Sequence, residues 1–190
     1  MKILVVGSGG REHAIIRALK KSPKAETIYA LPGNGGIAAD AICVEGSATD
    51  IDRVVSFSKD NGIDFVVVAP DNPLVLGMVD ALNEAGIATF GPRANAAILE
   101  GSKVFSKNLM KKYGIPTARY ETFDDAHAAV AYIEKMNEYP VVIKADGLAL
   151  GKGVIIAQNF AEAQDAVKSI MEDKAFGASG NHIVVEQFLE

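Results

Sequence analysis

A glycine-rich segment near the start of the chain could bind an anionic group. Residues 7–13 read GSGGREH and join an expected strand to an expected helix. Glycines at such a turn let backbone N–H groups approach an anion, and the N-terminus of the helix adds partial positive charge. Arg11 offers a planar guanidinium that suits phosphate. The dinucleotide fingerprint G-x-G-x-x-G fails at Glu12, so a phosphate ligand is predicted, with a plain tight turn as the alternative.

Two further loops are expected beside this segment. Residues 32–36, PGNGG, follow the second expected strand, and residues 70–74, PDNPL, follow the strand expected at 65–69. Parallel strands end at one edge of a sheet, where such folds bind ligands. Each loop alone is ordinary turn chemistry. Three loops at one edge predict a crevice for a small molecule.

A lysine and a second glycine-rich loop predict another anion site. Lys144 ends the apolar run at 141–143, and an ammonium group beside buried surface needs an anionic partner. Residues 146–153, DGLALGKG, follow directly and could fold over phosphates. The Walker A pattern is met only loosely, because Gly153 replaces Ser or Thr and no helix follows at once. A β-hairpin loop is the structural alternative.

Two other patterns carry weaker signals. Lys103 and Lys107 are four residues apart and share a helix face, and such a pair usually lies on a solvated surface. Residues 186–189 end the last expected strand, where alternate residues face opposite sides. Backbone groups and the Glu186 carboxylate could border a slot of adenine size, although a plain strand end is the simpler interpretation. The chain's one Cys and three His cannot form a metal cluster.

The elements that must position these residues alternate between strand and helix over the first hundred residues. Apolar, β-branched runs predict strands at 3–6, 27–31, 42–44, 65–69 and 88–90. Apolar stripes predict one helix that buries Ala14, Ile15, Ala18 and Leu19, one capped by Asp50 that buries Ile51, Val54 and Val55, and one that buries Leu74, Met78, Ala81 and Leu82. The alternation predicts an α/β domain, Rossmann-like, with an open parallel sheet covered on both faces.

The pattern changes after about residue 100 to that of a small α+β unit. A helix is expected at 102–113, a joint at 114–116, and strands at 118–122, 141–144, 154–157 and 183–188. Two helices between them would bury Ala126, Ala129, Val130 and Ile133, and Ala163, Ala166, Val167 and Ile170. The expected organisation is therefore a domain at 1–101, a connecting helix and linker at 102–117, and a unit at 118–190. The chain stops directly after an apolar strand, so it is expected to be part of a longer protein.

The composition excludes several classes of protein. The chain has 190 residues, of which 49% are hydrophobic and 23% charged, so disorder and collagen are excluded. A formal net charge of -5 gives no chain-wide basic field for nucleic acid. No apolar run approaches the roughly 20 residues that span a bilayer, so no membrane partner is expected. The single Cys43 cannot form an internal disulfide, which fits a reducing cytoplasm.

Taken together, these motifs resemble the glycinamide ribonucleotide synthetase family of the ATP-grasp superfamily. The matching segments are VVGSGGREHA (5–14), PGNGG (32–36), APDNPLVLGMVD (69–80), FGP (90–92), LEGSKVFSK (99–107), VVIKADGLALGKGV (141–154) and VVEQFLE (184–190). Asp71 and Gln187 stand where the family pattern has Glu. Asp71 keeps the carboxylate, whereas Gln187 keeps the shape and loses the charge.

The resemblance implies a fold, a reaction and partners. The fold would be a Rossmann-like (pre-ATP-grasp) open parallel sheet followed by a small α+β ATP-grasp subdomain. In the reaction, the carboxylate of glycine attacks the γ-phosphate of ATP, and the amine of 5-phosphoribosylamine attacks the resulting glycyl phosphate. The products are glycinamide ribonucleotide, ADP and phosphate. The ligands for Mg²⁺ (or Mn²⁺) would lie outside this chain, so the chain is expected to be an N-terminal fragment, inactive without the rest of its polypeptide.

The resemblance also assigns residues to sites. The ATP site would include Lys103, Lys144, Gly147, Gly151, Lys152, Gly153, Glu186, Gln187, Phe188 and Leu189. The phosphoribosylamine site would include Gly9, Gly10, Arg11, Glu12, Gly33, Asn34, Asp71 and Pro73. No residue of the chain is identified as a general base, and the carboxylate of glycine needs none.

Two other functions stay open at this point. The first is another ATP-grasp ligase that joins a carboxylate to an amine, against which the REH after the first glycines and the PGN loop argue. The second is a non-catalytic, Rossmann-like module for a dinucleotide or a regulatory nucleotide. The missing third glycine argues against that module, as does Lys144 with its loop.

Overall fold

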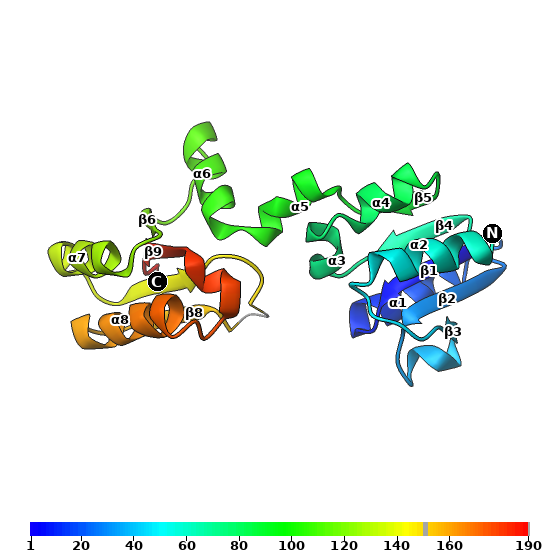
Figure 1. Cartoon of the computed structure of the whole chain (residues 1–190), viewed down its shortest axis with the longest axis horizontal. Coiled ribbons are helices and arrows are strands. Elements are labelled where there is room, and N and C mark those ends of the chain that lie inside the picture. The colour runs from blue at the N-terminus through cyan, green and yellow to red at the C-terminus, as the bar shows by residue number, and fades with distance from the viewer. Residues whose placement is uncertain (150–151, 190) are drawn as a thin grey trace. The chain divides into compact units, whose positions relative to one another are not determined.

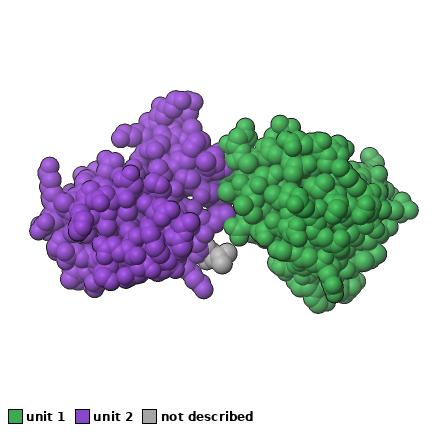
Figure 2. All heavy atoms as spheres, in the orientation of Figure 1, with its two compact units in different colours: residues 1–97 green, residues 98–190 purple. Residues whose placement is uncertain are grey.

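The polypeptide forms two compact units. The structure is a computed structural model that describes residues 1–149 and 152–189. The units are Met1–Ala97 and Ile98–Glu190, coloured separately in Figure 2. Helix α5, Ala94–Gly101, contains the boundary between them. Within the described residues, no helix is both long enough and apolar enough to cross a membrane.

The first unit is built on a five-stranded parallel sheet. Its strands lie in the order β3-β2-β1-β4-β5 (Figure 1). They are β1 (Lys2–Gly7), β2 (Thr27–Pro32), β3 (Ile42–Cys43), β4 (Phe65–Val68) and β5 (Ala88–Phe90). Leu4, Val5 and Val6 of the central strand are fully buried, as expected for an unbroken apolar run in a parallel sheet.

Helices cover both faces of this sheet. Helix α1 (Gly10–Leu19) places Ile16 against Val5 and Ala30 on one face. The other face packs against α2 (Ile51–Asp60) and α4 (Met78–Glu84), and Asp50 caps α2 by accepting a hydrogen bond from Arg53 N at 3.0 Å. A short 3-10 turn, η1 (Ile37–Ala39), follows β2. The predicted Rossmann-like α/β architecture is therefore confirmed.

The predicted buried face of α1 is confirmed for two of its four residues and wrong for the other two. Ala14 and Ala18 are exposed, whereas Ile16 is fully buried, and Ile15 and Leu19 are partly buried. Burial of one large aliphatic side chain removes more apolar surface from water than burial of an alanine. The helix is therefore rotated to bury Ile16, which the predicted stripe did not include.

The single helix predicted through Leu74 and Leu82 is two helices. Helix α3 (Asp71–Val75) and α4 are separated by Gly77, whose φ of +88° is incompatible with a continuous right-handed helix. Helix α5 was not predicted, because its Ala-rich sequence buries Ala97 alone and shows little amphipathic periodicity.

The second unit has a four-stranded antiparallel sheet in the order β6-β9-β7-β8. Its strands are β6 (Tyr120–Phe123), β7 (Val141–Ala145), β8 (Val154–Ala157) and β9 (Ile183–Gln187). Helices α7 (Ala126–Met136) and α8 (Phe160–Val167) lie side by side along one face (Figure 1). A π-helical turn, η2 (Lys168–Glu172), extends α8, and a 3-10 turn, η3 (Gly177–Asn181), precedes β9. The predicted small α+β unit is confirmed.

Strand alternation divides the side chains of this sheet between two environments. Ile143 and Val185 belong to the apolar cluster beneath α7 and α8. Lys144 and Glu186 are their sequence neighbours and therefore point to the opposite face. Helix α6 (Lys103–Tyr113), capped by Ser102, contacts β9.

Candidate functional site

Three loops of the first unit contact one another where β1, β2 and β4 end. Gly33 N donates a hydrogen bond to Gly7 O at 3.1 Å, and Asn34 Nδ2 donates to Ser8 O at 2.7 Å. A Cβ atom on Gly7 would lie 2.8 Å from Pro70 Cγ, so the third loop also lies against the first. The predicted convergence of these loops is confirmed.

Two glycines make this close approach possible. Gly7 has a φ of +124°, and a Cβ atom there would lie 2.6 Å from Glu12 Cγ. Gly33 has a φ of +71°, and its Cβ atom would lie 2.5 Å from Cys43 Sγ. A side chain at either position would clash and strain the backbone. By contrast, a Cβ atom on Gly10 would meet nothing within 4 Å, which leaves the start of α1 open to a ligand.

Glu12 turns back onto the loop that precedes it. Its Oε2 accepts a hydrogen bond from Gly9 N at 2.5 Å, so that N–H is already occupied. The residue is 3% exposed, and its Oε1 has no hydrogen-bond partner among the described residues. A buried acceptor in this state suits a ligand that donates a hydrogen bond. An anion at the start of α1 would instead meet the N–H groups of Gly10 and Arg11.

Arg11 and Asp71 face each other across the loops. Arg11 Nη1 lies 3.9 Å from Asp71 Oδ1, and the two side chains are 71% and 42% exposed. An ion pair this open contributes little to stability, so the guanidinium remains available to an anion. Pro73 is buried in the first helical turn after β4 and supports the loop instead of offering a polar group.

An ionic network that the sequence did not predict lies beside these loops. Asp40 accepts hydrogen bonds at 2.7 Å from Lys20 and at 2.8 Å from His13. The Lys20 hydrogen bond and then the His13 hydrogen bond lower the pKa of Asp40 from 3.8 to about 2. The His13 ring also lies beside Gly36, where a Cβ atom would be 3.6 Å from it. No sequence spacing links positions 27 residues apart.

The second unit contains a buried ion cluster around Glu186. Lys144 Nζ donates to Glu186 Oε2 at 2.9 Å, and Lys107 Nζ lies 3.2 Å from the same oxygen. The strand register pairs Val142 with Glu186 and Lys144 with Val184, so Lys144 and Glu186 are diagonal neighbours on one face. The anionic partner predicted for Lys144 is therefore Glu186.

The prediction that Lys107 lies on a solvated surface is wrong. Its side chain is 11% exposed, because α6 packs over β9 with this helix face inward. Lys107 Nζ also donates to Thr117 Oγ1 at 2.6 Å and lies 5.2 Å from the centre of the Tyr120 ring. Desolvation by burial raises the pKa of the Tyr120 phenol.

Lys103 is tied to the glycine-rich loop that follows β7. Its Nζ donates to Gly147 O at 2.8 Å. Asp146, which the sequence analysis did not single out, accepts from Val104 N and Ser102 Oγ, both at 3.1 Å. These contacts attach the start of the loop to the start of α6.

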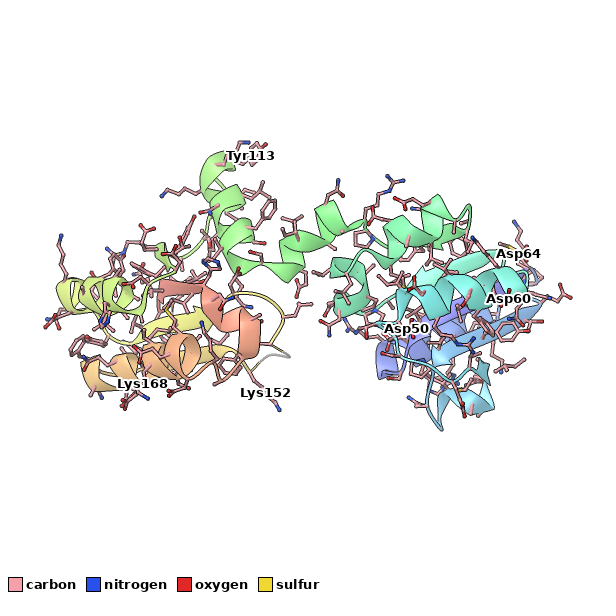
Figure 3. The ribbon with its side chains drawn as sticks, viewed as in Figure 1. Asp50, Asp60, Asp64, Tyr113, Lys152 and Lys168 are labelled. Carbon is pink, nitrogen blue, oxygen red and sulfur yellow. The ribbon has the colours of Figure 1, made fainter. Side chains whose placement is uncertain are left out.

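The other predicted site residues of this loop differ in their contacts and exposure. Gly147 has a φ of +88°, and a Cβ atom there would lie 2.9 Å from Ser179 Oγ. Gly153 O accepts from Ala145 N at 2.8 Å. The exposed Lys152 side chain points away from the ribbon (Figure 3). Gly151 lies outside the described residues.

Only some residues at the end of β9 lie on the sheet face that contains Lys144 and Glu186. Gln187 N donates to Arg119 O at 2.9 Å, and strand alternation turns the Gln187 side chain away from Glu186. Phe188 is half-buried, and Leu189 is 63% exposed. Val154 and Ile156 on β8 lie on the Lys144 face and are 41% and 46% exposed. Charged groups and apolar side chains thus share one surface, which suits a ligand with a phosphate and a flat ring.

Family models match both halves of the chain. The family model for the phosphoribosylglycinamide synthetase N domain matches residues 1–100, and the model for the ATP-grasp (A) domain of the same synthetase matches residues 101–190. The phosphoribosylamine–glycine ligase of Caldanaerobacter subterraneus subsp. tengcongensis is 48% identical over 189 residues, which are 100% of this chain and 45% of that protein. The ligase of Streptococcus pneumoniae is 47% identical over 191 residues, with the same coverage.

Solved structures show the same relationship. The crystal structure of phosphoribosylamine–glycine ligase from Thermotoga maritima has a TM-score of 0.80 and 31% identity, and the match covers 100% of this chain and 44% of that one. A biotin carboxylase from Campylobacter jejuni has a TM-score of 0.81 at 17% identity, which is a likeness of fold alone. This chain spans about 45% of the length of the curated relatives it matches. Since the two family models together cover its whole length in order, the chain belongs to the phosphoribosylglycinamide synthetase family.

Proposed function

We propose that this chain is the N-terminal part of a phosphoribosylamine–glycine ligase. The observation that carries the proposal is the match of both family models, in order, from residue 1 to residue 190. In this proposal residues 1–101 hold 5-phosphoribosylamine, residues 118–190 form one wall of the ATP site, and residues 102–117 connect them. The exposed, single Cys43 fits a cytoplasmic enzyme of purine biosynthesis.

The proposed ATP site uses the two lysines whose present partners a phosphate can replace. Lys103 donates to a backbone carbonyl, and Lys144 donates to Glu186. For Lys103, a phosphate oxygen is a stronger acceptor than the neutral carbonyl that it contacts now. The loop with Gly147, Gly151, Lys152 and Gly153 would close over the phosphates with its backbone N–H groups and the Lys152 ammonium.

The adenine ring would lie at the apolar end of the same face. Val154 and Ile156 offer exposed apolar surface, and Glu186 Oε1 has no partner among the described residues. That oxygen would accept a hydrogen bond from the amino group of adenine. The backbone at Gln187, Phe188 and Leu189 would border the ring. The Gln187 side chain faces away from Glu186 and would take no part.

The sugar-phosphate site would divide its ligand between cation and carboxylates. Arg11 and the N–H groups of Gly9, Gly10 and Arg11 surround the open start of α1, with the Gly9 N–H available once Glu12 moves to the ligand. Glu12 and Asp71 would accept hydrogen bonds from hydroxyl and amine groups. Gly33 and Asn34 fix the second loop against the first, and Pro73 fixes the third.

The chemistry needs charge neutralisation more than proton transfer. A carboxylate oxygen of glycine forms a bond to the γ-phosphorus of ATP, and the bond from that phosphorus to the β–γ bridging oxygen breaks, which releases ADP. The amine of phosphoribosylamine then attacks the acyl carbon, phosphate leaves, and the amine nitrogen loses one proton. Lys103 and Lys144 would neutralise the phosphate charge that opposes the first step.

Divalent metal is proposed to come with the rest of the polypeptide. Across residues 1–149 and 152–189, no group of three or more His, Cys, Asp or Glu side chains could hold a metal ion. The described residues therefore offer no complete set of protein ligands for a resident Mg²⁺ or Mn²⁺.

Separate titrations of ribose 5-phosphate and ATP test this proposal. The chain should bind ribose 5-phosphate weakly, and Arg11→Ala should abolish that binding while Lys144→Ala leaves it unchanged. ATP affinity should respond in the opposite way, with a loss of about tenfold or more in Lys144→Ala because a charge-assisted hydrogen bond is removed. Binding of NADH without ribose 5-phosphate would instead identify a dinucleotide module and overturn the proposal.

A further inference from the structure

The buried carboxylate of Glu186 has two lysine partners on the same oxygen. Lys144 Nζ is 2.9 Å and Lys107 Nζ 3.2 Å from Oε2, while Oε1 has no partner among the described residues. Glu186 is 6% exposed, Lys107 is 11% exposed and Lys144 is 26% exposed. One lysine would be enough to neutralise the carboxylate, so charge balance alone does not explain the second lysine.

The two lysines are held very differently. Lys107 is fixed on three sides by Glu186, by the Thr117 hydroxyl at 2.6 Å and by the Tyr120 ring at 5.2 Å. Lys144 lies near the end of a strand, beside the glycine-rich loop, and within the described residues it has Glu186 as its hydrogen-bond partner. Lys144 can therefore move to a new anion, whereas Lys107 would lose several contacts if it moved.

A carboxylate buried this deeply cannot be left without a counter-ion. Removing one partner of a buried ion pair is strongly unfavourable, because the remaining charge is uncompensated. If Lys144 were the sole partner of Glu186, its transfer to a phosphate would incur that penalty. With Lys107 still 3.2 Å away, Glu186 stays neutralised throughout the transfer.

We propose that Lys107 is a positioning residue that holds Glu186 charged and in place while Lys144 exchanges Glu186 for a phosphate oxygen of the nucleotide. Lys107 itself does not touch the nucleotide. The inference rests on the proposed function, because it takes the Lys144 face as the ATP site. It predicts that Lys107 affects phosphate binding through the charge of Glu186.

The test is a double-mutant cycle read by calorimetric titration of the 190-residue chain. Inorganic tripolyphosphate is the probe. Because it has no adenine base, a direct contact between Glu186 and adenine cannot contribute to the measured affinity. Lys107→Met should weaken tripolyphosphate binding about tenfold, because Glu186 then retains Lys144. In the Glu186→Gln background the same Lys107→Met change should alter affinity less than about twofold, since no charge remains to retain Lys144.

Matched variants separate charge from structure. Lys107→Arg keeps the positive charge and should bind tripolyphosphate like the parent chain. Lys111→Met removes an exposed lysine one turn further along α6 and should also leave affinity unchanged. Circular dichroism and the Tm of each variant check folding. If Lys107→Met does not fold, Lys107→Gln, which can still hydrogen bond to Thr117, takes its place in the cycle.

The outcomes distinguish the inference from the proposed function. If the parent chain binds neither tripolyphosphate nor ATP, or if Lys144→Ala binds both as well as the parent does, the proposed ATP site fails and the inference fails with it. If Lys144→Ala weakens binding but Lys107→Met has the same effect with and without Glu186→Gln, the ATP site survives. In that case Lys107 has a merely structural role, and this inference alone is overturned.

Discussion

At the scale of single residues, both candidate sites contain a buried carboxylate with one unused oxygen. Glu12 is held by the Gly9 N–H at 2.5 Å, and Glu186 is held by two lysines. In each case Oε1 has no partner among the described residues. An unused buried acceptor favours a ligand that brings a donor and disfavours one that brings a second acceptor. Both proposed sites should therefore select for ligands that carry an amino or hydroxyl group beside the proposed phosphate.

Asp40 supports a prediction on acid stability. Its pKa of about 2 in the folded chain lies below the ordinary 3.8, so its ionised form stabilises the fold above pH 3.8. This contribution is lost as the pH falls from 3.8 towards 2. Asp40→Asn should lower Tm at neutral pH, and its Tm should fall less steeply between pH 4 and pH 2 than that of the parent chain.

Thermal unfolding followed by circular dichroism across this pH range measures the effect. Asp60→Asn is the matched control, because Asp60 is exposed at the end of α2 and makes no hydrogen bond through its side chain within the described residues (Figure 3). An Asp40→Asn curve that runs parallel to the parent curve would contradict the assignment.

At the scale of elements, the strand register brings the three loops of the first unit together at one edge of the sheet. Gly7 pairs with Pro32, and Val6 pairs with Val68, so β1, β2 and β4 end side by side. In the second unit, the antiparallel register of β7 and β9 places Lys144 diagonally opposite Glu186. In both units the strand register therefore determines where these loops and side chains meet.

The break between α3 and α4 gives a prediction on backbone strain. Gly77 has a φ of +88°, and a Cβ atom there would meet Ala94 Cβ and Asp80 Oδ2 no closer than 3.9 Å. The cost of Gly77→Ala is therefore conformational, and the free energy of unfolding should fall by about 1–2 kcal/mol. Chemical denaturation measures it. Gly35→Ala is the control, because its Cβ atom would meet nothing within 4 Å and its φ is not positive; an equal loss in both variants would refute the explanation.

At the scale of the whole molecule, the two proposed sites belong to separate units. Each unit has its own apolar core, and the family models divide the chain at residues 100 and 101, close to the structural division after Ala97. The chain spans 45% of the length of its curated relatives. The proposed reaction needs both sites together with divalent metal, so binding and turnover should be separable.

The corresponding prediction concerns turnover. The 190-residue chain should bind ribose 5-phosphate and ATP, yet release no ADP when glycine, phosphoribosylamine, ATP and Mg²⁺ are supplied. The physical reason is that no group of metal ligands lies within residues 1–149 and 152–189. A coupled assay for ADP measures it, with a full-length ligase of the family as the positive control. Steady ADP release that depends on glycine would show that the chain is active alone.

The sequence alone determined most of the local structure. Apolar runs predicted the strands of both sheets, Asp50 and Ser102 marked helix starts, and glycines marked the loops that follow the strands. These features depend on a few neighbouring residues, whose backbone preferences and spacing are visible along the chain. The family resemblance likewise followed from contiguous motifs.

Tertiary structure decided which of these faces were buried and which charges met. Spacing showed that Lys103 and Lys107 share a helix face, but only packing of α6 on β9 buried Lys107 beside Glu186. The Lys144–Glu186 pair joins residues 42 apart, and the His13–Asp40 pair joins residues 27 apart. Periodicity identifies residues that point the same way, whereas what they point at depends on elements far along the chain.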